Sequence, residues 1–284
     1  MRKLVIAVLC AAFGFAGFSQ CPAQERGVFA RAMARQSEHA FYLPKGLSEI
    51  SGVAPASDRS VFAHNDEFGI VYEIELETGK VARAFALGKP TVKADFEDIA
   101  ARGGSIYLLT SDGRIFEARI GEHRKRVLYN VYDTGIGQRC ETEGLTIGPG
   151  NEEFLILCKT MHDPALKERL VVFAWSLAER APAVTPWLNV PLDGLVDELD
   201  QANFHPSAFA WRRDAGTFLI VSSKGRTAIE IDAEGRLIAR FKLEKKRHNQ
   251  PEALALMPDG RLVVGDEGAR GRGRITVYAP TTRL

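Results

Sequence analysis

The sequence predicts an all-β fold, a single β-propeller of five blades. The first observation is a five-residue pattern that recurs five times along the chain. The second is that the second residues of these copies are 46, 46, 64 and 45 residues apart. The third is that each copy opens a unit with further short β-like runs and turns. The copies are Ile50–Ala54, Phe96–Ala100, Thr142–Thr146, Pro206–Ala210 and Pro251–Ala255.

Each unit has the composition of a propeller blade. A turn follows the pattern, and then comes an apolar run such as Ile106–Leu109 or Phe218–Val221. A third run alternates apolar and polar residues, as in Val71–Ile74. A period near 45 residues with several strands per unit is typical of propellers, in which only the outer strands meet water. A sixth blade, the alternative, would have to lie within residues 160–204.

The ends of the chain predict how the ring closes. The fifth unit reaches Leu284 without room for a fourth strand. The segment His39–Pro44 precedes the first unit and has strand character. We therefore expect it to add the outer strand of the last blade, which would leave no open sheet edge.

The N-terminal residues indicate export. Arg2 and Lys3 precede the apolar run Leu4–Phe18, and small residues follow at Cys21 and Ala23. This pattern is typical of a cleaved secretory signal. We predict a signal peptide over residues 1–23, a linker over 24–38 and the propeller over 39–284, in a periplasmic or secreted protein. A signal anchor, or a lipoprotein lipidated at Cys21, is the alternative.

Charge and cysteine content further restrict the class of protein to which the chain can belong. The formal net charge is +1, which argues against a nucleic-acid binder because such proteins carry a basic excess. No later apolar stretch is long enough to span a membrane, and we expect a monomer. Removal of the signal would leave two cysteines, Cys140 and Cys158. They form a disulfide candidate in an oxidising compartment, the alternative being two separate buried thiols.

The repeat places acidic residues at one mouth of the central channel. The second residues of the five copies form a predicted ring of Ser51, Glu97, Glu143, Ser207 and Glu252. Glu49 stands two residues before the ring, while Asp66 and Glu267 stand fifteen residues after it. Crowded carboxylates raise one another's pKa or require a cation. We predict a metal site of Glu97, Glu143, Glu252, Glu49, Asp66 and Glu267, with Ca²⁺ as the ion because it prefers oxygen ligands.

Two further features of this mouth bear on chemistry. His205 precedes Ser207 by two residues and could act as a metal ligand or general base, or form a structural hydrogen bond. Lys159 is one of the basic residues expected to reach the same face. The chain contains no Gly-x-Ser-x-Gly elbow, phosphate-binding loop, zinc-spaced cluster or dinucleotide fingerprint.

At these motifs the sequence resembles the SdiA-regulated family of exported bacterial β-propellers. The resemblance rests on the copies around Ser51, Glu97, Glu143, Ser207 and Glu252, together with Asp259-Gly260 and Asp266-Glu267-Gly268. It implies an exported propeller with calcium in the channel. It implies no catalytic mechanism.

Two functions therefore stay open. The first is a binding or scaffold module that recognises a small molecule or protein at the channel mouth. The second is a metal-dependent hydrolase of a lactone or phosphoester, with His205 and Glu143 as catalytic residues. The absence of a recognisable nucleophile and base pair favours the first.

Overall fold

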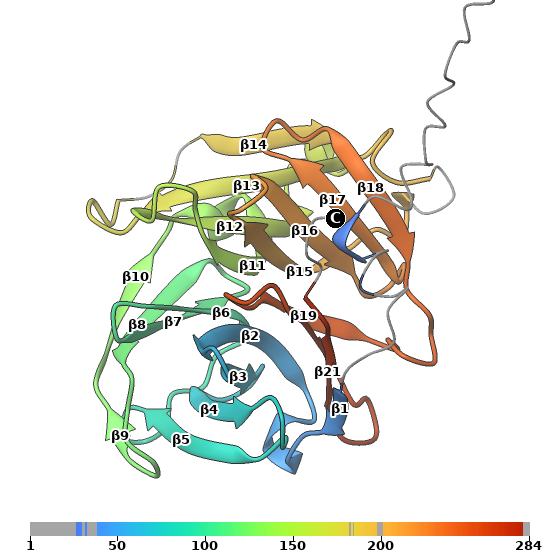
Figure 1. The fold of residues 1–284 in the computed structure, drawn as a ribbon. Helices are drawn as coiled ribbons and strands as arrows, with labels where there is room; N and C mark the ends of the chain where they lie inside the picture. Colours follow the sequence, from blue (N-terminus) through green and yellow to red (C-terminus); the bar gives the residue numbers. More distant parts are fainter. Residues whose placement is uncertain are drawn as a thin grey trace, which may run out of the picture.

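The computed structural model describes residues 27–29, 32, 39–181, 183, 185–197 and 201–280. The predicted signal peptide, residues 1–23, lies outside the described residues, as does most of the predicted linker. Five antiparallel sheets stand in a ring around a central channel (Figure 1). The prediction of an all-β propeller of five blades is confirmed.

Each blade begins at the channel and continues outward. Blade 1 contains β2 (Ile50–Ser57), β3 (Ser60–Asn65), β4 (Ile70–Glu75) and β5 (Val81–Leu87). Blade 2 contains β6 (Phe96–Arg102), β7 (Ser105–Thr110), β8 (Arg114–Arg119) and β10 (Tyr129–Asp133). Blade 3 contains β11 (Cys140–Ile147), β12 (Glu153–Met161), β13 (Arg169–Ser176) and β14 (Pro186–Pro191). Blade 4 contains β15 (Pro206–Arg212), β16 (Thr217–Ser222), β17 (Thr227–Asp232) and β18 (Leu237–Lys242).

Blade 5 closes the ring with strands from both ends of the chain. It contains β19 (Pro251–Leu256), β20 (Leu262–Asp266), β21 (Arg274–Tyr278) and β1 (His39–Tyr42). His39 pairs with Val277 and Tyr42 with Arg274 in an antiparallel ladder. The predicted closure is confirmed, and the six-blade alternative is wrong, because β13 and β14 are the outer strands of blade 3.

Short elements connect the blades. The two-residue strand β9 (Arg126–Val127) pairs in parallel with β5, so the chain of blade 2 also touches the edge of blade 1. Three 3₁₀ turns are formed by η2 (Lys45–Leu47), η3 (Ile136–Gln138) and η4 (Pro164–Leu166). Among the described residues no helix is long and apolar enough to cross a membrane.

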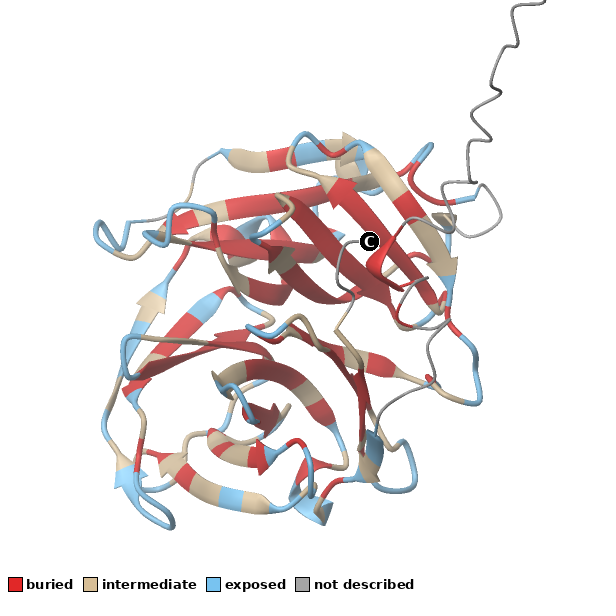
Figure 2. Ribbon diagram, viewed as in Figure 1, coloured by how far each residue is buried: buried red, intermediate tan, exposed pale blue. Residues whose placement is uncertain are grey.

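The core lies between the blades. Figure 2 shows buried residues along the inner and middle strands, whereas exposed residues gather on loops and outer edges. All six residues of β7 and all six of β16 are buried. The outer strand β10 has only half-buried and exposed residues, as the edge of a blade should. This division matches the sequence pattern of apolar inner and alternating outer strands.

Part of the predicted linker belongs to the core. Val28, Phe29 and Ala32 are buried in an apolar cluster formed by blades 4 and 5. The backbone N–H of Val28 donates a hydrogen bond of 2.8 Å to Oε2 of Glu230. The Glu230 carboxylate is itself buried and accepts a bond of 2.9 Å from Arg212. The segment around Phe29 therefore docks on the propeller and does more than tether it.

Candidate functional site

A β-bulge marks the ring position in every blade. In each innermost strand the ladder register shifts at the residue that the sequence predicted for the ring. A bulge leaves one residue unpaired and re-aims its side chain. The five bulged residues are Ser51, Glu97, Glu143, Ser207 and Glu252.

Four of these residues line one polar cavity at the mouth of the channel. The cavity has a volume of about 220 Å³. Seven of its lining residues are acidic and one is a lysine. The lining comprises Glu49, Ile50, Ser51, Asp66, Asp95, Glu97, Glu143, Lys159, Glu252 and Glu267. All six predicted metal ligands thus lie at this cavity.

The two serines of the ring tie neighbouring blades together. Ser51 Oγ donates a hydrogen bond of 3.1 Å to the carbonyl of Glu97, in the next blade. Ser207 Oγ likewise donates to the carbonyl of Pro251 at 2.7 Å. These bonds hold the backbone beside Glu97 and Glu252, so the serines position the carboxylates that flank them.

Lys159 is the cationic residue in the inner part of this cavity, next to the ring. Its Nζ lies 3.0 Å from Oε2 of Glu143 and 3.7 Å from Oε1 of Glu141. Oxygens of Glu97, Glu141 and Glu143 lie within 4.8 Å of one another. The Glu143 side chain is only 4% exposed. An ammonium group therefore already faces the most buried carboxylate of the ring.

Burial dominates the protonation of the inner carboxylates. It raises the pKa of Glu97 and of Glu252 to about 7, although the nearby Lys159 ammonium opposes the shift. Burial and the Glu97 carboxylate raise the pKa of Glu143 well above its usual value. Burial lowers the pKa of Lys159, but Glu143 and Glu97 raise it more, so its net change is upward. Lys159 therefore stays charged, while Glu97 and Glu252 keep their protons up to about pH 7.

A second group of carboxylates lies in the outer part of the cavity. Burial and the Glu49 carboxylate raise the pKa of Asp66. Burial, Glu49 and Asp66 raise the pKa of Glu267. Gln250 Nε2 donates to Glu267 Oε2 at 2.8 Å, whereas the buried Oδ1 atom of Asp66 has no hydrogen-bond donor. We call Glu49, Asp66 and Glu267 the outer trio.

The outer trio and the ring differ in how they could receive a cation. Ca²⁺ takes carboxylate oxygens in a flexible shell, and the outer trio offers them without an opposing ammonium in contact. Its oxygens do not approach one another as closely as those of Glu97, Glu141 and Glu143, which lie within 4.8 Å of one another. At the ring, however, Lys159 already neutralises part of the charge of Glu143.

The spacing of fifteen residues between the ring and the second group of mouth residues holds in two blades only. The ladder pairs the residue before the ring with Asn65, Thr110, Cys158, Ser222 and Asp266. The next residue along the chain takes the same place beside the mouth in each blade. These residues are Asp66, Ser111, Lys159, Ser223 and Glu267. Because the turns between first and second strands differ in length, a count of fifteen residues from the ring reaches this place in blades 1 and 5, whereas in blade 3 it reaches Cys158, next to Lys159.

His205 lies outside this group. It is half-buried, its backbone N–H donates to Ser222 Oγ at 3.0 Å, and it is not among the residues that line the cavity. Cys140 and Cys158 form a disulfide with a Cα–Cα distance of 5.8 Å. The bond joins β11 to β12 directly beside Glu141 and Lys159, so it fixes the strands that carry the inner site.

Comparisons with known proteins agree with the fold. Residues 190–284 match the family model described as SdiA-regulated, so the resemblance to this family is confirmed over the end of β14, blade 4 and the last three strands. A search of curated proteins gave no match.

Solved structures resemble the chain in fold. Glutaminyl cyclase of Myxococcus xanthus matches with a TM-score of 0.57 and 14% identity, over 86% of this chain and 95% of that one. A streptogramin B lyase matches with a TM-score of 0.43 and 14% identity, over 86% and 73% of the two chains. At 14% identity the similarity to the glutaminyl cyclase shows the fold alone.

Proposed function

We propose that this protein is a binding propeller that takes a cation, with Ca²⁺ the expected ion, at the acidic mouth of its channel. One observation carries the proposal. Seven acidic residues, brought there in part by bulges at equivalent positions in the blades, line a cavity of about 220 Å³ with a single lysine. So much negative charge in partly dry surroundings favours a bound cation.

The outer trio would hold the ion in this proposal. The support is that Asp66 Oδ1 is buried without a donor, that burial and Glu49 raise the pKa of Asp66, and that burial, Glu49 and Asp66 raise the pKa of Glu267. A bound divalent cation would relieve their repulsion and give a partner a positive centre to recognise. Lys159 and the ring would keep the floor of the cavity charged and rigid.

Calcium titration with thermal unfolding tests the proposal. Ca²⁺ should raise the unfolding temperature of the wild type, because a ligand that binds only the folded state adds about 2.7 kcal/mol at a hundredfold excess over Kd. The variant Glu49→Gln/Asp66→Asn/Glu267→Gln should lose this stabilisation. The matched control Asp58→Asn/Glu77→Gln/Glu122→Gln changes three exposed acids elsewhere and should keep it. Equal responses of the two variants, or no response of the wild type, would overturn the cation site.

We also propose that the protein works outside the cytoplasm. The signal-like pattern of residues 1–23 supports this, as does the disulfide between Cys140 and Cys158, since disulfides persist in oxidising compartments. The mass of the protein from a cell envelope fraction checks the proposal. An intact N-terminus on protein recovered only from the cytoplasm would contradict it.

A metal-dependent hydrolase is the second candidate. The observation that favours it is the raised pKa of Glu143 and Glu97 beside an ammonium group, because a carboxylic acid protonated near neutral pH can transfer a proton. Glu143 would be the acid, and the ion at the outer trio would polarise the substrate. Turnover of lactone or phosphoester panels that disappears in Glu143→Gln, with folding intact, would establish this function. Calcium binding without turnover would leave the binding module.

A further inference from the structure

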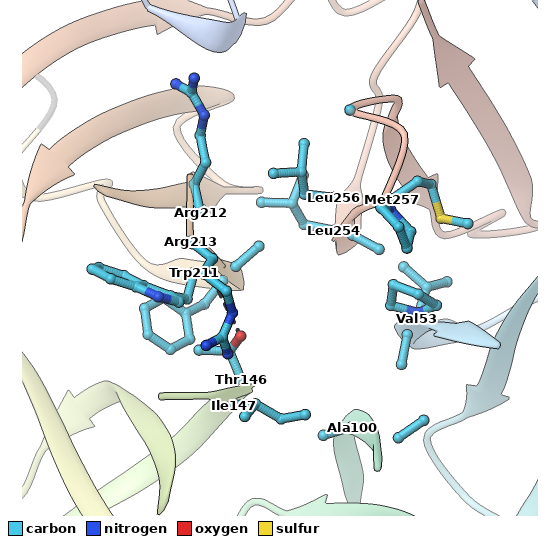
Figure 3. A pocket seen from close by; sticks show the side chains of 18 of the residues that line it. Val53, Ala100, Thr146, Ile147, Trp211, Arg212, Arg213, Leu254, Leu256 and Met257 are labelled. Carbon is cyan, nitrogen blue, oxygen red and sulfur yellow. Dashed lines mark hydrogen bonds between the residues drawn. The ribbon is translucent and has the colours of Figure 1, made fainter. Parts of the chain in front are cut away.

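The opposite end of the channel holds a second, larger cavity of about 910 Å³ (Figure 3). All five innermost strands contribute to its walls. The residue two positions after the ring is large, apolar and buried in every blade, and these five residues separate the cavity from the acidic mouth. They are Val53, Ile99, Leu145, Phe209 and Leu254.

The walls below this layer are also mostly apolar. Leu256 and Met257 extend from β19 and the turn after it, and Figure 3 shows Leu254 and Leu256 side by side at the cavity wall. Small residues such as Ala100 and Ala255 leave the space open. A cavity of this size with apolar walls and few polar groups is typical of small-molecule sites.

Four charged residues line the cavity, and three of them, Arg213, Asp214 and Asp259, are exposed at the surface. The fourth, Arg212, is buried. Arg212 pairs with Glu230 at 2.9 Å and with Asp214 at 3.2 Å. Asp259 pairs with Arg261 at 2.7 Å. Arg212, Asp214 and Asp259 therefore already have partners of opposite charge.

Arg213 differs from these three residues. Its guanidinium donates to the carbonyls of Pro149 at 3.0 Å and Gly148 at 3.4 Å and to Oδ1 of Asn151 at 2.6 Å. These acceptors are neutral, and no carboxylate among the described residues pairs with Arg213. Its side chain is held in place while its positive charge remains available to attract a carboxylate.

We propose that this cavity binds an amphiphile with an anionic head and an unbranched apolar chain, such as a fatty acid. The chain would fill the space below the layer of Leu145 and Phe209, and the carboxylate would face Arg213 at the rim. The acidic mouth beyond that layer would repel an anion, so only one orientation is favoured. This site is separate from the cation site and does not depend on it.

Calorimetric titration of the full chain with dodecanoate tests the site. The experiment is run in EDTA and below the micelle concentration, with dodecanol and dodecyltrimethylammonium as probes of head-group preference. Dodecanoate should bind saturably at one molecule per chain and more tightly than the other two. Equal binding of dodecanol, or a response that does not saturate, would overturn the proposal.

Three variants locate the site. Leu256→Asp places a charge in the wall and should abolish binding of all three probes. Arg213→Glu should weaken dodecanoate binding about tenfold or more and reverse the preference towards dodecyltrimethylammonium. Arg124→Glu makes the same charge change on an exposed turn and should bind as the wild type does. Thermal unfolding establishes that each variant is folded, and unchanged dodecanoate affinity in folded Leu256→Asp and Arg213→Glu would also overturn the proposal.

Discussion

The ammonium nitrogen of Lys159 lies 3.0 Å from Oε2 of Glu143, at the inner end of a cavity whose other charged residues are carboxylates. This pair changes the role expected for the ring. A cation was expected there from the number of acids, and the chain itself provides one from β12. The remaining excess of negative charge lies towards solvent, at Glu49, Asp66 and Glu267.

Removal of the lysine should destabilise the fold in a pH-dependent way. Lys159→Met leaves Glu143 and its neighbours without a counterion, and we expect a loss of about 2 kcal/mol in the free energy of unfolding at pH 8. At pH 5 the loss should be smaller, because Glu97 and Glu252, whose pKa values are about 7, are then protonated. Denaturant unfolding at the two pH values measures both effects.

Lys167→Met is the matched control, since Lys167 is exposed on the loop that follows β12. It should change the free energy of unfolding by less than about 0.5 kcal/mol at either pH. If Lys159→Met lost as much stability at pH 5 as at pH 8, charge balance would not be the role of Lys159.

The raised pKa of Glu97 predicts how stability depends on pH. The folded protein holds this proton up to about pH 7, whereas the unfolded chain releases it near the ordinary value of 4.5. The folded state therefore binds more protons between these values, and this contribution to stability, fully present below about pH 4.5, is lost as the pH rises through about 7. Glu97→Gln should flatten the fall in unfolding free energy over this window. Unfolding curves at half-unit pH steps measure the slope.

Glu77→Gln provides the reference slope, because Glu77 is exposed in a turn of blade 1. It should follow the wild-type curve. A Glu97→Gln curve parallel to that of the wild type would show that the Glu97 proton does not respond to folding.

The sequence repeat was enough to predict most of the fold and part of the site. Periodic copies locate the innermost strands, and the shared position of Glu97, Glu143 and Glu252 is enough to bring them to one mouth. The bulges at those positions could not be predicted from the residue types, because neither serine nor glutamate requires a bulge. Lys159 reaches the mouth as the sequence predicted, but its place opposite Glu143 could not be predicted, since residue counting cannot allow for turns of unequal length, whereas the ladder register does.

The apolar cavity and the docked N-terminal segment were not predicted from the sequence, for a related reason. Val53 and Leu254 are apolar residues of the kind found in any buried strand. Their residue types therefore do not distinguish the wall of the channel from the interfaces between blades. Val28 and Phe29 occupy a short stretch among polar residues, too short for a periodic signal. Their burial depends on contacts with blades that follow far along the chain, which local patterns do not contain.

The docked segment gives the last prediction. Phe29 is 2% exposed within the cluster of blades 4 and 5, so Phe29→Ala should lower the free energy of unfolding by about 3 kcal/mol through lost burial and the cavity left behind. Leu128→Ala, at a residue that is 92% exposed, should cost less than about 0.5 kcal/mol. Urea unfolding of both variants measures the difference. Equal stability of the two would mean that residues 24–38 form a linker after all, whereas the expected loss would make the segment around Phe29 part of the propeller, packed between blade 4 and blade 5.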